Sequence, residues 1–232
     1  MFTVRATETW DAPESVQDAF LLERKLDLPT DELILQGRSR STGQRAWIKC
    51  RDSSEESREL LAAESRVLAG LDHPHVLTLQ DSGGQDGSYL LYKWEAEQPL
   101  DDESLGALQP VDRARLAGAL VATVCYLQDR PEPVAHGQLV LENLWVSQRV
   151  KWLRLAGFGK AVAGASADAL RSDRQAVVTL VDLILAANDV SAAVEKELRL
   201  FGAAWMEDPA AGISDYTGAL KRVLLGCITV DL

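Results

Sequence analysis

The segment His136-Gly-Gln-Leu-Val-Leu-Glu-Asn-Leu-Trp-Val146 places four polar side chains, those of His136, Gln138, Glu142 and Asn143, within an apolar stretch. The neutral amide of Gln138 cannot act as a general base. A lone Asn143 is a poor metal site, because hard cations need several oxygen ligands. The apolar residues 144–146 predict a short strand after this loop.

The sequence before this segment is typical of strands with one helix. Apolar runs predict strands at residues 20–27, 32–38, 45–51, 76–80 and 88–94. Gly43 marks a turn between the second and third of these runs. A helix is expected to open at Ser53, with capping serines and first-turn acids, and to end before Pro74. These elements predict a small antiparallel sheet with one helix packed on it.

Beyond residue 100 the pattern becomes mainly helical. Helices are predicted at residues 111–128, 173–187, 191–206 and 214–225, with short strands around 144–146 and 152–155. A strand-rich half followed by a helix-rich half is an α+β arrangement. No internal repeat is visible.

Further motifs occur before and after the segment of residues 136–146. They are Ala46-Trp-Ile-Lys49, a helical Glu64, Leu71-Asp-His-Pro-His75, Leu155-Ala-Gly-Phe-Gly159, and Ser172-Asp173 at the expected start of an apolar helix. With these motifs the chain resembles the protein-kinase superfamily over residues 20–225. The resemblance implies one kinase-like domain over residues 1–232 with a two-lobe fold. Its parts would be a lead-in (1–19), an N-lobe with a small antiparallel sheet and one helix (20–95), and a reduced, mainly helical C-lobe (96–232).

The resemblance also implies roles for individual residues. Lys49 would be the lysine that holds nucleotide phosphates, Glu64 its helix partner, and Asn143 a magnesium ligand, so these three mark a vestigial nucleotide site. The packed spine of the family would consist of Leu68, Leu79, His136 and Phe158, and Asp173 would support the backbone of the catalytic loop.

Departures from the family pattern remove the chemistry. Gln138 stands at the position of the catalytic aspartate, and Gly157 at that of the magnesium-binding aspartate. Counting back from Lys49, Asp27, Pro29 and Glu32 fall where the phosphate loop should have glycines. Proline lacks a backbone amide and carboxylates repel an anion, so this loop is unsuited to phosphate.

The nucleotide cleft of the family would also be filled in this chain. Trp47 replaces the alanine that lies over adenine, Trp145 stands on the expected pocket floor, and Tyr92 belongs to a bulky hinge. Each Trp buries roughly 200 Å², which leaves little room for an adenine ring. Only residues 161–171 separate the Gly157 motif from the helix expected at Ser172, which is too short for an activation segment.

Composition narrows the class of partner. A net charge of −11 argues against binding nucleic acid or an anionic membrane. The three cysteines and three histidines show no metal-ligand spacing, and we expect neither metal nor cofactor. No signal peptide is recognisable, and the longest apolar run (176–187) is too short for membrane insertion. These features lead us to expect a cytoplasmic protein.

The function implied by the resemblance is that of a pseudokinase, an inactive kinase that acts as a scaffolding or allosteric module in signalling. Its partners would be proteins, including an active kinase or another signalling component, bound along the Glu64 helix and around residues 161–171. Two alternatives stay open. One is a divergent kinase-fold transferase that uses Lys49, Glu64 and Asn143, and the other is a sensor of a nucleotide or another small molecule.

Overall fold

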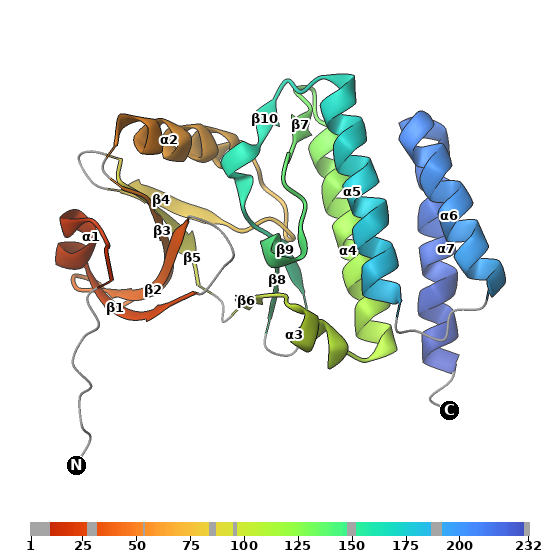
Figure 1. Ribbon diagram of the computed structural model, residues 1–232, viewed down its shortest axis with the longest axis horizontal. Helices are drawn as coiled ribbons and strands as arrows, with labels where there is room; N and C mark the ends of the chain where they lie inside the picture. Colours follow the sequence, from red (N-terminus) through yellow and green to blue (C-terminus); the bar gives the residue numbers. More distant parts are fainter. Residues whose placement is uncertain are drawn as a thin grey trace, which may run out of the picture. The chain divides into compact units, whose positions relative to one another are not determined.

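The computed structural model describes residues 10–26, 32–52, 54–83, 87–94, 97–147, 152–186 and 192–229. The chain forms two compact units, one of residues 1–70 and 78–94, the other of residues 71–77 and 95–232. The fold is α+β, with a five-stranded antiparallel sheet in the first unit and mainly helices in the second (Figure 1). The residues before Trp10, Ser53 at the expected helix start, and Asp27 and Pro29 of the expected phosphate loop lie outside the described residues.

The sheet of the first unit has the strand order β1-β2-β3-β5-β4. Its strands are β1 (Phe20–Lys25), β2 (Leu33–Ser39), β3 (Arg45–Cys50), β4 (Leu79–Gly83) and β5 (Tyr89–Lys93). The turn expected at Gly43 is confirmed, because this glycine has a φ of 71° and its amide donates to the Ser39 carbonyl at 2.8 Å. Positive φ favours glycine, which has no Cβ to clash.

A helix covers each face of this sheet. Val16 of α1 (Glu14–Ala19) packs into a core with Leu35 and Ile48. Side chains alternate between the faces of a strand, so Lys49 points to the opposite face, where it meets Glu64 of α2 (Glu55–Ala69). The buried positions of α2 recur at helical spacing: Ser57, Leu61, Glu64 and Leu68. Helix α1 was not expected within the lead-in, because six residues are too few to show a helical period.

The strand expected at residues 76–80 is wrong in its position. Val76 forms a parallel bridge to Leu155, and the Leu77 amide donates to the Leu155 carbonyl at 2.9 Å. These residues therefore belong to the second unit, and β4 of the first unit begins only at Leu79. An apolar run alone does not show that it divides between two pairing partners.

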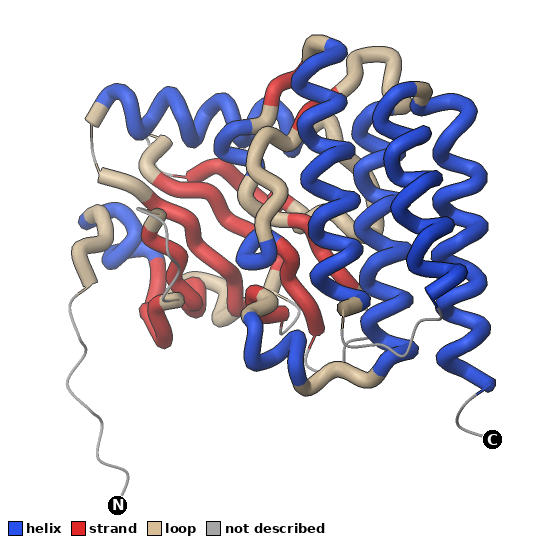
Figure 2. The backbone as a smooth tube through the Cα atoms, turned by 45° about the vertical axis from the view of Figure 1, so that its right-hand side comes forward, coloured by secondary structure: helices blue, strands red, loops and turns tan. Residues whose placement is uncertain are grey.

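The described residues of the second unit form five α-helices, two short 3-10 helices and two small sheets (Figure 2). The helices are α3 (Asp102–Gly106), α4 (Pro110–Gln128), α5 (Ala167–Leu185), α6 (Ala192–Glu207) and α7 (Pro209–Thr229). Strand β8 (Leu144–Ser147) lies between β6 (Glu97–Pro99) and β9 (Leu153–Leu155), and β7 (Val134–Ala135) pairs with β10 (Val162–Ala163). None of the described helices is long and apolar enough to cross a membrane.

Two helix starts differ from those expected. Helix α5 begins at Ala167 instead of Asp173, because the Ser166 hydroxyl caps it by accepting from the Ala169 amide. Only residues 161–166 therefore separate the Phe158 turn from this helix, which makes the segment shorter than expected. Helix α7 begins at Pro209, before the expected residue 214, because proline is well suited to a first helical position.

Candidate functional site

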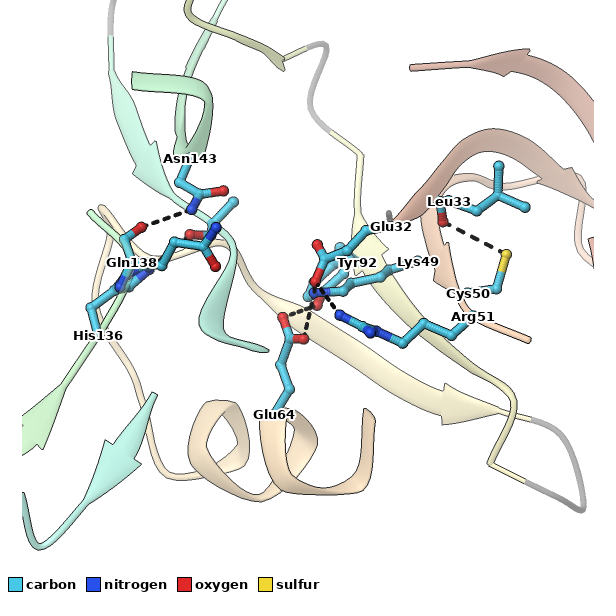
Figure 3. Close-up of polar contacts among 11 residues, drawn as sticks. Glu32, Leu33, Lys49, Cys50, Arg51, Glu64, Tyr92, His136, Gln138 and Asn143 are labelled. Carbon is cyan, nitrogen blue, oxygen red and sulfur yellow. Dashed lines mark hydrogen bonds and ion pairs between the residues drawn. The ribbon is translucent and has the colours of Figure 1, made fainter. Parts of the chain in front are cut away.

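Lys49 and Glu64 form a buried ion pair within the first unit (Figure 3). Lys49 Nζ lies 2.6 Å from Glu64 Oε2, and each side chain is 2% exposed. Strand β3 presents the lysine, and the buried face of α2 presents the glutamate. The two residues that the kinase resemblance pairs are thus in direct contact.

Lys49 also contacts a second carboxylate. Its Nζ lies 2.7 Å from Glu32 Oε1, and the same oxygen accepts a hydrogen bond from Arg51 at 2.9 Å. Burial alone would raise the pKa of Glu32, but Lys49 and Arg51 outweigh it and hold this pKa below its usual 4.5. The carboxylate is therefore charged at neutral pH.

The contact between Glu32 and Lys49 was not predicted from the sequence, in which Glu32 was interpreted only as a residue that repels phosphate. The signal lay in the strand register. Leu33 pairs with Cys50 across the β2–β3 ladder, so the preceding Glu32 stands opposite Arg51 and diagonal to Lys49. Opposite charges at such positions attract each other on one face of a sheet.

Tyr92 completes this cluster. Its hydroxyl donates to Glu64 Oε1 at 2.8 Å, so both oxygens of Glu64 are bonded. Burial, reinforced by the Glu64 charge, raises the pKa of Tyr92 well above its usual value. We call Glu32, Lys49, Arg51, Glu64 and Tyr92 the buried network, in which two cations balance two carboxylates.

The expected cleft-filling tryptophans are both buried, each within its own unit. Trp47 lies in β3 with 1% exposure, and the Arg24 guanidinium stands 5.6 Å from its ring centroid. Trp145 lies in β8, where it pairs with Pro99 and Arg154 on the neighbouring strands. Both rings contribute to the packed interior of the unit that contains them.

In the second unit, hydrogen bonds hold the loop that follows β7. Asp173 of α5 accepts from the amides of His136 at 2.5 Å and Gly137 at 3.0 Å. The His136 ring donates from Nε2 to the Ala156 carbonyl at 2.9 Å and accepts from the Gln138 amide at its other nitrogen. Burial raises the pKa of Asp173, although the two amide bonds oppose this shift. These hydrogen bonds join the loop to Asp173 of α5 and to Ala156, the residue after β9.

Asn143 also bonds within the loop. Its Nδ2 donates to the Gln138 carbonyl at 2.8 Å (Figure 3). Gly157 lies against the same side chain, because a Cβ built on this glycine would stand 2.2 Å from Asn143 Oδ1. Gly157 has a φ of 77°, which disfavours any residue with a side chain. An aspartate at this position would require both a backbone change and displacement of Asn143.

Gly137 occupies a second position at which a side chain would be strained. Its φ is 74°, and a Cβ would stand 2.6 Å from the Lys160 carbonyl oxygen. Because that neighbour is backbone, it cannot rotate away. A residue with a side chain at this position would therefore require a shift of the loop backbone.

The residues expected to form a spine are divided between the units. His136 and Phe158 are buried in the second unit with ring centroids 4.6 Å apart in an edge-on arrangement. Leu68 is buried on α2 in the first unit, whereas Leu79 is only half-buried at the start of β4. Each pair is thus placed within its own unit.

No group of three or more His, Cys, Asp or Glu side chains in the described part of the chain is arranged to hold a metal ion. Neither the models of known protein families nor the curated protein sequences match this chain. The resemblance to kinases therefore remains a prediction from the order of the motifs in the sequence.

Proposed function

We propose that this protein is a pseudokinase, a non-catalytic module that binds protein partners and acts as a scaffold or allosteric regulator in cytoplasmic signalling. The observation that carries the proposal is the contact between Asn143 and Gly157. In kinases the corresponding asparagine and aspartate hold magnesium. Here Gly157 supplies no carboxylate, and a side chain at its position would have to displace Asn143, whose Oδ1 would stand 2.2 Å from the added Cβ.

The position of the general base supports the same proposal. Gln138 replaces the aspartate that would accept the substrate proton, and an amide does not take up a proton at neutral pH. His136 does not substitute for it, because one ring nitrogen bonds to the Ala156 carbonyl and the other to the Gln138 amide. The loop keeps a supported backbone without a group that can activate a hydroxyl.

One observation favours the alternative of a divergent transferase or a nucleotide sensor. The Lys49–Glu64 ion pair, which kinases need in order to position phosphates, is formed. Against this alternative, the second carboxylate on Lys49 occupies a donor that a phosphate would require. A direct test of ATP binding and phosphoryl transfer therefore decides between this alternative and the proposed function.

The test is radiolabel transfer from ATP, combined with a thermal-shift assay. We expect no incorporation into the protein or generic substrates, and no rise in Tm with millimolar ATP and magnesium. A ligand at 100 times its Kd would stabilise the protein by about 2.7 kcal/mol, a readily detected effect. Incorporation that is lost in Lys49→Arg would overturn the proposal in favour of the transferase, since this variant keeps the charge but changes its geometry.

Partner binding needs a test of its own. Glu59 and Arg66 are exposed on α2, and the double variant Glu59→Lys/Arg66→Glu keeps the net charge unchanged. We expect it to fold normally and to recover less of a captured partner than the wild type. Asp215→Lys/Lys221→Asp on α7 is the matched control, because both residues are also exposed. Equal recovery with all three proteins would remove α2 as the partner surface.

A further inference from the structure

The buried network contains the parts of an anion-binding site, and the chain itself supplies the anion. Lys49 and Arg51 converge on one atom, Glu32 Oε1, at 2.7 and 2.9 Å. Ammonium and guanidinium groups are also the side chains that bind phosphate most often. We propose that Lys49 and Arg51 form a site for phosphate-bearing ligands that the Glu32 carboxylate occupies and keeps closed. This inference deepens the proposed function and rests on it, since it gives a physical reason why Lys49 takes no nucleotide.

Charge balance prevents a phosphate from binding to Lys49 and Arg51 while Glu32 is in place. The two cations are already matched by Glu32 and Glu64, and Lys49 is almost fully buried. A phosphate added beside both carboxylates would place excess negative charge in a poorly solvated site. A ligand oxygen can therefore enter only by replacing Glu32 Oε1, one anion in exchange for another.

The geometry also shows from which end this exchange occurs. Exposure rises along the network from 2% for the side chains of Lys49 and Glu64 to 17% for Glu32 and 24% for Arg51. Glu32 precedes Leu33, the residue at which the β2–β3 pairing begins. Its side chain can leave Lys49 without breaking that ladder, whereas Glu64 is fixed on the buried face of α2 and bonded to Tyr92.

The experiment removes the internal anion and supplies an external one. Sodium pyrophosphate is titrated calorimetrically at constant ionic strength into the wild type, Glu32→Ala and Glu32→Ala/Lys49→Met. We expect Glu32→Ala to bind pyrophosphate about tenfold or more tightly than the wild type, the factor given by one added bond to a charged group. Adding Lys49→Met should abolish the gain.

Glu23→Ala is the matched control. Glu23 also neutralises two arginines, Arg38 at 3.3 Å and Arg45 at 3.1 Å, and its removal changes the net charge equally. Both arginines are more than a third exposed, so they form no enclosed site. An equal gain in this control, or no gain in Glu32→Ala, would overturn the inference.

Folding of the variant is measured separately. If Glu32→Ala does not fold in chloride, its refolding yield in pyrophosphate is compared with that in sodium chloride of equal ionic strength. A yield restored by pyrophosphate alone supports the site, and equal yields refute it. Phosphoryl transfer by the wild type would overturn the proposed function instead. The inference is therefore tested by pyrophosphate binding to the Glu32→Ala variant, and the proposed function by radiolabel transfer in the wild type.

Discussion

Replacement of Lys49 by alanine tests how strongly the buried network stabilises the first unit. The lysine is 2% exposed and lies between two carboxylates, at 2.6 Å from Glu64 and 2.7 Å from Glu32. Its loss leaves Glu64 charged and buried with only the Tyr92 hydroxyl, while Glu32 keeps Arg51. Breaking a buried pair in this way costs about 3–5 kcal/mol. The smaller contribution of about 0–1 kcal/mol that is typical of exposed ion pairs does not apply here, because both Lys49 and Glu64 are buried.

An exposed ion pair provides the reference for the stability lost in Lys49→Ala. Arg222 bonds to Glu197 between α7 and α6, with side chains 48% and 42% exposed, and Arg222→Ala should cost about 0–1 kcal/mol. Urea unfolding, followed by far-ultraviolet circular dichroism, gives the free energy of unfolding of each variant. Losses for the two variants that agree within about 1 kcal/mol, the scatter expected of exposed pairs, would refute the stabilising role of the network.

A second variant separates the unpaired charge from the lost contact. In Lys49→Met/Glu64→Met the buried Glu64 charge is removed together with its partner, Glu32 keeps Arg51, and the Tyr92 hydroxyl loses its acceptor. We expect this double variant to lose less stability than the sum of the two single changes, because the residues are in direct contact. Additive losses would show that the two charges act independently.

The remaining predictions concern packing, backbone and pH. Phe158→Ala and Leu68→Ala should each cost about 2–5 kcal/mol by urea unfolding, as buried large-to-small changes do. Gly137→Ala should cost about 1–3 kcal/mol because of its positive φ, and calorimetry should show a lower Tm. Because the pKa of Glu32 is lowered in the folded state, its contribution is complete above pH 4.5 and is lost as the pH falls further. Glu32→Gln should therefore show a weaker loss of stability below pH 4.5, and an unchanged profile would contradict this assignment.

The elements that could be predicted from sequence are those set by local patterns. The strands around Lys49 and the helix that carries Glu64 follow from alternation, the Gly43 turn and the cap at Ser54. The strand at residues 76–80 could not be placed, because Val76 pairs with Leu155, far away in the sequence. The start of α5 was also misplaced, since Ser172-Asp173 has the composition of a cap although Asp173 lies inside the helix.

The contacts of the candidate site were likewise predictable from the sequence only in part. The contact between Lys49 and Glu64 was expected from motif spacing, whereas Glu32 required knowledge of the register between β2 and β3. The steric limits at Gly137 and Gly157 depend on backbone angles and on neighbours distant in sequence, Lys160 and Asn143. The sequence shows that Gly157 lacks a carboxylate, but it does not show that Asn143 lies against this position.

The polar groups that would face a ligand in a kinase are bonded to partners within this chain. Lys49 contacts Glu32 and Glu64, and the amide nitrogen of Asn143 donates to the Gln138 carbonyl. A buried polar group gains little from a new ligand when the same bonds must first be broken. Binding through the exposed face of α2 requires no such exchange, which is why we propose recognition of proteins at the surface instead of chemistry at these positions.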